Sequence, residues 1–256
     1  MPRGNSMQTV CWSEASCELQ PQQGRSMTSP DFPDRRRLLQ LAGASATALW
    51  LPRSAWSQPR LASNPFTLGV ASGSPTHDSV VLWTRLHGPG LLGASLGREP
   101  ITVQWQVAHD DKFARIVLGG QAIASPELAH SVHVEVTGLE PDRWYFYRFM
   151  VGDAVSPVGR TRTFPKADAA VARLRLGYAS CQKWEDGYFT AWRHMREENL
   201  DAVMFLGDYI YEYTGRSSKV RIPSGGWVLS LDDYRQRYAL YRGEADLQAM
   251  HATCPW

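Results

Sequence analysis

The chain has 256 residues and a mass of 28.7 kDa, and 43% of its residues are hydrophobic, so it is long enough for one or two domains with apolar cores. Its 27 basic and 25 acidic residues leave a net charge of +2. This near balance argues against a protein that coats nucleic acid or an anionic membrane surface. No apolar run reaches the roughly 20 residues that a membrane-spanning helix needs, and four scattered cysteines are too few for a disulfide-dense scaffold.

The first 60 residues are typical of a leader that directs export. Residues 1–34 are rich in Ser, Gln, Pro and Gly without an apolar period, so we expect them to be disordered. Three arginines at 35–37, two leucines and a weakly apolar Ala- and Gly-rich run up to residue 51 resemble a twin-arginine signal, with cleavage expected near Ser57. The alternative is a basic patch beside a short helix. The sequence therefore predicts transfer by the twin-arginine machinery to the periplasm or the extracellular space.

Residues 62–165 are predicted to form a β-sandwich domain. Short runs of β-branched and aromatic residues are separated there by Gly, Pro, Asp and Ser, which is the spacing of an all-β sandwich. The expected strands are 66–71, 79–86, 101–108, 116–118, 131–136, 144–151 and 158–164. The small, polar and aperiodic stretch at 165–172 is predicted to be a linker to a second domain.

Two local patterns support the sandwich. In 131–136, valines alternate with polar residues, which predicts one buried face and places His133 in solvent. The segment 138–147 resembles the turn and strand of fibronectin-type sandwiches in which a tyrosine hydroxyl bonds back to the backbone, and Tyr145 is the candidate. The histidines of this domain lack a partner at metal-ligand spacing, so we expect surface residues without a metal role: His77, His87, His109, His130 and His133.

The second domain, predicted from residue 173 onward, begins as strand, helix, strand. The expected strands are 173–180 and 201–206, and the expected helix is 187–199. Two parallel strands joined by a helix end at the same edge of their sheet, and this edge is where open α/β sheets bind ligands. Cys181 and Asp208 follow the two strands, so we expect their side chains to face one cavity.

Three side chains near these strand ends offer donors for a metal ion. Asp208 supplies a hard carboxylate, Cys181 a thiolate, and Tyr211 a phenolate that forms near neutral pH only on a strongly Lewis-acidic ion such as Fe(III). One trivalent iron suits all three. The alternative is that Cys181 is a small buried thiol and Tyr211 packs in the core.

Other titratable residues in this region are assigned no role. Glu185, Asp186 and Glu212 are expected to form a solvated rim, and His251 falls within a helix expected over 244–252 and is taken as structural.

In combination, several segments of the chain resemble PhoD-type alkaline phosphatases. The matching segments are 66–73, 78–85, 179–182, 187–189, 207–213 and 234–238, and they occur in unbroken order from about residue 62 to the end. The resemblance implies a β plus α/β architecture. A fibronectin-like β-sandwich is followed by a calcineurin-like metallophosphoesterase α/β sandwich, of which 173–256 would be the first, truncated part.

The resemblance also implies a chemistry. The family hydrolyses phosphate monoesters and diesters at an Fe(III) and calcium centre, in which the residues that match Cys181, Asp208 and Tyr211 bind the iron and the aspartate bridges towards calcium. Such a centre polarises a phosphoryl oxygen and neutralises developing charge, and Asp208 would be its catalytic carboxylate. The substrate-binding residues stay unassigned, and no stable complex with nucleic acid is expected.

One departure from the family pattern concerns the end of the chain. The Asp-Asp-His-Glu-type segment and the later Asn and His ligands of the family do not occur before Trp256. We therefore expect an amino-terminal fragment that is active only with its remainder. The alternatives are an inactive remnant and a non-catalytic β-sandwich binding module, and the joint presence of Cys181, Asp208 and Tyr211 argues against the module.

Overall fold

The structure, a computed structural model, describes residues 63–88, 96–213, 215, 219–223 and 226–256. The predicted disordered leader and twin-arginine signal lie outside the described residues. Within the described part of the chain, no helix combines the length and the hydropathy that a bilayer-spanning segment requires.

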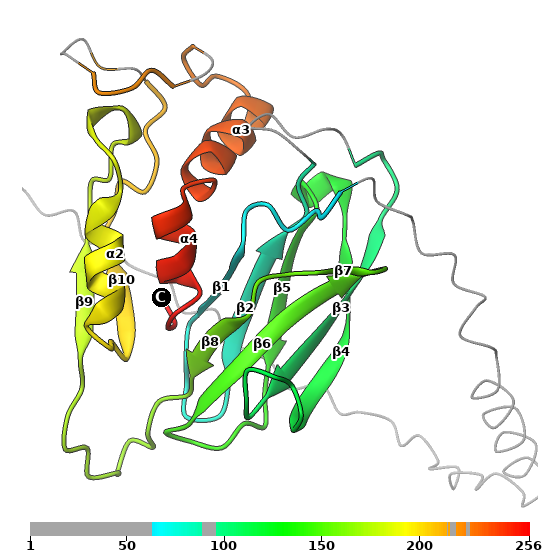
Figure 1. Cartoon of the computed structure of the whole chain (residues 1–256), viewed down its shortest axis with the longest axis vertical. Helices are drawn as coiled ribbons and strands as arrows, with labels where there is room; N and C mark the ends of the chain where they lie inside the picture. Colours follow the sequence, from blue (N-terminus) through cyan, green and yellow to red (C-terminus); the bar gives the residue numbers. More distant parts are fainter. Residues whose placement is uncertain (1–62, 89–95, 214, 216–218, 224–225) are drawn as a thin grey trace, which may run out of the picture. The chain divides into compact units, whose positions relative to one another are not determined.

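Two antiparallel sheets form the first part of the described chain (Figure 1). The first sheet has the order β1 (Val70–Gly73), β2 (Val80–Arg85) and β5 (Ser131–Val136). The second has the order β4 (Ile116–Ala124), β3 (Ile101–Ala108), β6 (Trp144–Val151) and β7 (Ala154–Val155), and β8 (Gly159–Arg162) also pairs with β6. A 3-10 helix, η2 (Pro126–Leu128), lies between β4 and β5.

Side chains from both sheets fill one buried core, which confirms the predicted sandwich. The first sheet contributes residues such as Val80 and Leu82, and the second contributes residues such as Val103 and Phe149. Strand β5 alternates as expected, with its valines buried and His133 exposed. Such alternation directs one side of each strand into the core and leaves the other for solvent.

The tyrosine expected at the corner of the sandwich makes the expected contact. The backbone N–H of Glu140 donates to the hydroxyl of Tyr145 over 2.9 Å. The ring of Tyr145 is fully buried, so this one hydrogen bond ties the turn before β6 to the core.

Strand β4 is longer than predicted. The sequence predicts that it ends at residue 118, and in the structure it ends at Ala124. Gly119 and Gly120 both lie within the strand. A Cβ on Gly120 would come within 2.8 Å of the indole ring of Trp105 on the neighbouring strand. Only a residue without a side chain leaves room for the indole ring at this position, and strand propensity does not predict such a contact.

The expectation that all five histidines lie at the surface is wrong for His87 and His130, which are both buried. The Nδ1 atom of His130 lies 3.2 Å from the carbonyl oxygen of Ala124, and Nδ1 of His87 lies 3.4 Å from the hydroxyl of Thr67. Burial, followed by the charge of Arg85, lowers the pKa of His87. Both rings therefore serve the packing of the sandwich.

The second part of the chain contains the predicted strand, helix, strand unit. Strands β9 (Leu176–Ala179) and β10 (Ala202–Phe205) pair in parallel, and η3 (Trp184–Asp186) and α2 (Thr190–Glu197) lie between them in sequence (Figure 1). Strand β9 starts three residues later than predicted. Helices α3 (Leu231–Arg242) and α4 (Ala245–His251) follow, and α3 begins with a capping box formed by Ser230 and Asp233.

A second hydrophobic core joins these elements. Its buried members are Phe189, Trp192, Leu200, Val203, Tyr241, Leu247, Met250 and Cys254. The backbone of 255–256 links this part to the sandwich. The N–H of Trp256 donates to Ser72 O of β1 over 2.9 Å. The N–H of Val203 on β10 donates to Pro255 O, also over 2.9 Å. Hydrogen bonds at the chain's last residues thus connect β1 with the parallel pair.

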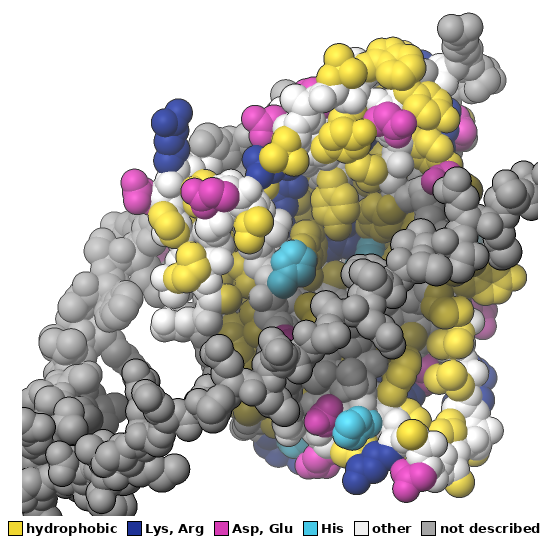
Figure 2. All heavy atoms as spheres, turned by 180° about the vertical axis from the view of Figure 1, so that it is seen from behind, with side chains coloured by type: hydrophobic (Ala, Val, Ile, Leu, Met, Phe, Trp, Pro, Cys, Tyr) yellow, Lys and Arg dark blue, Asp and Glu magenta, His cyan; other side chains and the backbone are white. Residues whose placement is uncertain are grey.

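Hydrophobic side chains are also visible at the surface of the molecule (Figure 2). Four of the exposed ones belong to the same face of the β9–β10 pair: Leu176, Tyr178, Met204 and Leu206. The opposite face, with Val203 and Phe205, packs against the second core. Within the described residues, only one face of this small sheet is covered.

Candidate metal site

The candidate site lies where two loops leave the parallel strands. The N–H of Cys181 donates to Gly207 O over 3.1 Å, and the N–H of Gln182 donates to Asp208 O over 3.3 Å. These bonds continue the pairing of β9 and β10 beyond the ends of both strands. The loops that follow the two strands therefore run beside each other, as the predicted topology requires.

The backbone in these loops adopts conformations that side chains usually avoid. Cys181 and Asp208 have φ angles of 58° and 57°, and Gly207 has a φ of 137°. A left-handed conformation costs a non-glycine residue about 1–2 kcal/mol, and such residues cluster at functional sites. Two of them at facing strand ends indicate that the turns are maintained for the direction of their side chains.

Two of the three predicted donors, Cys181 and Tyr211, converge on one carboxylate oxygen of the third, Asp208. Oδ2 of Asp208 accepts a hydrogen bond from the hydroxyl of Tyr211 over 2.9 Å and one from Sγ of Cys181 over 3.5 Å. Cys181 and Asp208 are exposed, and Tyr211 is half-buried. The alternative interpretation of Cys181 as a small buried thiol is therefore wrong.

The surroundings of Tyr211 favour the protonated phenol when no metal is bound. Partial desolvation, followed by the hydrogen bonds with Asp208 and Cys181, raises the pKa of Tyr211 above its ordinary value. The protonated phenol donates a hydrogen bond to the Asp208 carboxylate, as the structure shows.

The donor set fits a metal ion that accepts both oxygen and sulfur ligands. A carboxylate, a phenolate and a thiolate within one small, solvent-accessible space suit a trivalent iron. Within the described residues, no three His, Cys, Asp or Glu side chains form a metal-binding group, so Tyr211 is needed as the third donor. A calcium ion takes 6–8 oxygen ligands, and this donor set has only two side chains with oxygen donors, Asp208 and Tyr211.

An ion pair beside the site was missed from the sequence. Nζ of Lys183 lies 3.1 Å from Oε1 of Glu185, and the ammonium also lies 5.8 Å from the ring centroid of Tyr211 and 5.3 Å from that of Tyr213. The expectation that Glu185 belongs to a solvated rim is wrong, because its side chain is only 3% exposed. It is buried because Lys183 and the N–H of Gly215 satisfy its carboxylate.

Comparisons with known proteins agree with this fold. Residues 52–165 match the N-terminal domain of PhoD-like phosphatases, and residues 176–256 match the PhoD-like phosphatase domain. The chain is 46% identical over 236 residues to alkaline phosphatase D of Bacillus subtilis (strain 168), covering 87% of the chain and 40% of that protein. It is also similar to a solved structure of PhoD, with a TM-score of 0.75 and 49% identity.

That similarity covers 77% of the chain and 39% of the PhoD structure, so the chain spans less than half the length of either relative. The two domain matches follow one another in the order of the sandwich and the parallel pair. The chain belongs to the PhoD-like phosphatase family.

Proposed function

We propose that the protein carrying this chain hydrolyses phosphate monoesters or diesters, and that Cys181, Asp208 and Tyr211 form one side of its metal centre. The observation that supports this most is the approach of the Tyr211 hydroxyl and the Cys181 thiol to one oxygen of Asp208, at 2.9 and 3.5 Å. A module that only binds a partner has no need of three such donors at facing strand ends.

Cys181, Asp208 and Tyr211 would hold an Fe(III) ion, and Asp208 would also supply a carboxylate ligand for a calcium ion. When bound, such ions supply the Lewis acidity that polarises a phosphoryl oxygen and neutralises charge as the ester P–O bond breaks. Tyr211 and Asp208 contribute hard oxygen donors, and the paired loops after β9 and β10 keep the donor atoms close before any ion binds. The remaining ligands for calcium have to come from residues other than these three.

The place of action proposed for this protein is the periplasm or the extracellular space. The arginines at 35–37 and the weakly apolar run after them support export by the twin-arginine machinery. This route suits a metalloenzyme, because it carries proteins that are already folded.

The test is an Asp208→Ala substitution in the protein expressed from its whole reading frame. Hydrolysis of p-nitrophenyl phosphate and bis-p-nitrophenyl phosphate, together with the metal content of the purified protein, would be measured. We expect both to be lost, because the substitution removes the oxygen on which the other two donors converge. Asp232→Ala is the matched control, since Asp232 is an exposed aspartate paired with Arg235 on α3. Retained turnover in Asp208→Ala would overturn the site assignment.

A further inference from the structure

Helix α3 directs two buried polar side chains towards the loops of the candidate site. Arg237 and Tyr241 are 4% and 2% exposed, and residues four apart lie on the same face of a helix. In the described part of the chain, Arg237 forms no ion pair with a carboxylate. Burying a guanidinium costs free energy unless hydrogen bonds satisfy its N–H groups. The hydrogen-bond partners of Arg237 therefore indicate its structural role.

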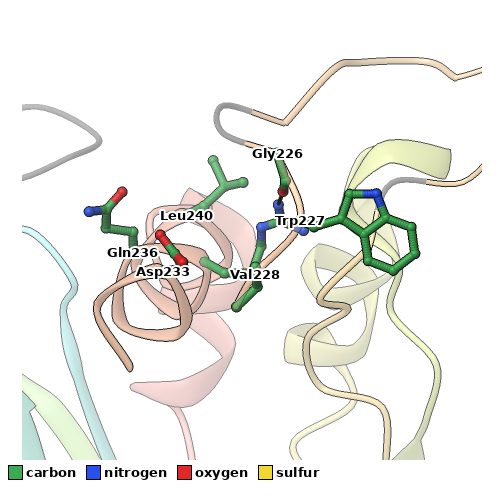
Figure 3. Close-up of a pocket in the computed structure, with 7 residues that line it drawn as sticks. Gly226, Trp227, Val228, Asp233, Gln236 and Leu240 are labelled. Carbon is green, nitrogen blue, oxygen red and sulfur yellow. Dashed lines mark hydrogen bonds between the residues drawn. The ribbon is translucent and has the colours of Figure 1, made fainter. Parts of the chain in front are cut away.

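The partners of Arg237 are backbone carbonyls on two separate segments. Its Nη1 donates to Tyr211 O over 2.6 Å, and its Nη2 donates to Gly226 O over 3.1 Å. Gly226, Trp227 and Val228 lie beside α3 around a small cavity of about 30 Å³ (Figure 3). Arg237 also lines this cavity. Hydrogen bonds from a charged donor are stronger than neutral ones, so Arg237 fixes the backbone of a proposed metal ligand.

The partner of Tyr241 belongs to the other loop. The N–H of Trp184, three residues after Cys181, donates to the hydroxyl of Tyr241 over 3.1 Å. Burial raises the pKa of Tyr241, and the hydrogen bond from the Trp184 amide opposes this rise. The Tyr241 ring itself is anchored in the second core beside Phe189, with 5.9 Å between the ring centroids.

One face of α3 thus holds both loops of the site. The loop with Cys181 is bonded at Trp184, and the loop with Asp208 is bonded at Tyr211. The distances among the three donor atoms depend on how these two loops are placed relative to each other. A shift of either loop by a fraction of an ångström would alter the fit to a metal ion.

We propose that Arg237 and Tyr241 are positioning residues that fix the two loops of the metal site relative to one another. This inference rests on the proposed function of that site. Side chains that orient the ligands of a metal typically contribute about 10–100-fold to its affinity.

The experiment compares two pairs of variants on the same helix. Tyr241→Phe removes only the buried hydroxyl, and Arg237→Met removes only the guanidinium. The matched controls are Tyr234→Phe, an exposed tyrosine, and Arg235→Met, whose guanidinium bonds Asp232 and the Glu127 carbonyl outside the site. Fe(III) affinity is measured by titration, and backbone hydrogen exchange of the metal-free protein is measured with the amides of β6 as an internal reference.

We expect Tyr241→Phe and Arg237→Met to weaken Fe(III) binding about 10–100-fold, and both controls to bind as the unsubstituted protein does. The Trp184 amide should exchange faster in Tyr241→Phe while the β6 amides do not change. Unchanged affinity and unchanged Trp184 exchange would overturn the inference, even if stability falls. If the unsubstituted protein binds no Fe(III), the proposed function fails, and the Trp184 exchange alone then decides whether Tyr241 positions the loop.

Discussion

The sandwich and the candidate site are held by different kinds of interaction. In the sandwich, alternating side chains of two sheets fill a shared core, and Tyr145, Tyr147 and Phe149 are fully buried. At the ends of β9 and β10, the donor residues are exposed or half-buried, and hydrogen bonds between loops and from α3 hold them. Substitutions in the sandwich should therefore change stability, and substitutions at the site should change metal binding more than stability.

The largest effect is expected from the sandwich core. Phe149→Ala should lower the free energy of unfolding by about 3–5 kcal/mol, because it removes a fully buried ring that packs edge-on against Tyr147. Urea unfolding followed by tryptophan fluorescence measures the change. Ile123→Ala, at an exposed position of β4, should stay within about 0.5 kcal/mol. Equal losses in the two variants would contradict the description of the core.

An intermediate effect is expected from pH, through a histidine near the junction of the two regions. Nε2 of His251 lies 2.8 Å from the hydroxyl of Tyr209, and its ring stacks on Trp256. Burial, followed by the charge of Arg242, lowers the pKa of His251 well below its usual range. As the pH falls through about 6.5, the imidazole of His251 takes up a proton in the unfolded chain but stays neutral in the folded chain. The free energy of unfolding should therefore decrease below that pH by up to about 1.4 kcal/mol per pH unit.

The measurement is the free energy of unfolding between pH 7.5 and 5 for the unsubstituted protein and for His251→Gln. Well above pH 6.5, His251 is neutral in both states and contributes almost no slope. Other titrating groups are shared by the two proteins, so the difference between the two slopes reports His251. The variant should lose stability less steeply as the pH falls. Parallel curves would contradict the assignment of a buried, neutral imidazole.

The smallest effect is expected at the corner of the sandwich. Tyr145→Phe keeps the buried ring and removes the acceptor of the Glu140 N–H, so the loss should be about 1 kcal/mol. Thermal unfolding of this variant is compared with that of Tyr178→Phe, where the ring is exposed and little change is expected. A loss above about 3 kcal/mol would mean that the hydroxyl supports more than one hydrogen bond.

Much of the fold was predictable because its signals are local. Alternating valines predicted the buried face of β5, and the apolar run after Asp201 predicted β10 beside β9. The prediction was wrong where a contact between strands decides the outcome. Glycine weakens the interior of a strand, and only the neighbouring indole of Trp105 explains the place of Gly120 inside β4.

The candidate site was predictable only in part for the same reason. Cys181 and Asp208 follow two strands of a parallel pair, so the sequence predicts that they lie close together, as they do. The burial of Glu185 depends on Lys183 and on Gly215, which is 30 residues away, and Tyr241 reaches Trp184 across 57 residues. The hydrophobic periodicity of a sequence does not predict contacts between residues so far apart in the chain. The domain boundaries and the export signal stay predictions.

The most direct test of the site is the optical spectrum of the protein loaded with Fe(III). A phenolate bound to Fe(III) gives a visible ligand-to-metal charge-transfer band, so the unsubstituted protein should become coloured on titration. Tyr211→Phe keeps the ring and removes the donor oxygen, so it should lose the phenolate contribution to this band, while a contribution from the Cys181 thiolate remains. A colourless complex in the unsubstituted protein, or a band of equal intensity in Tyr211→Phe, would contradict the assignment of Cys181, Asp208 and Tyr211 as an iron site.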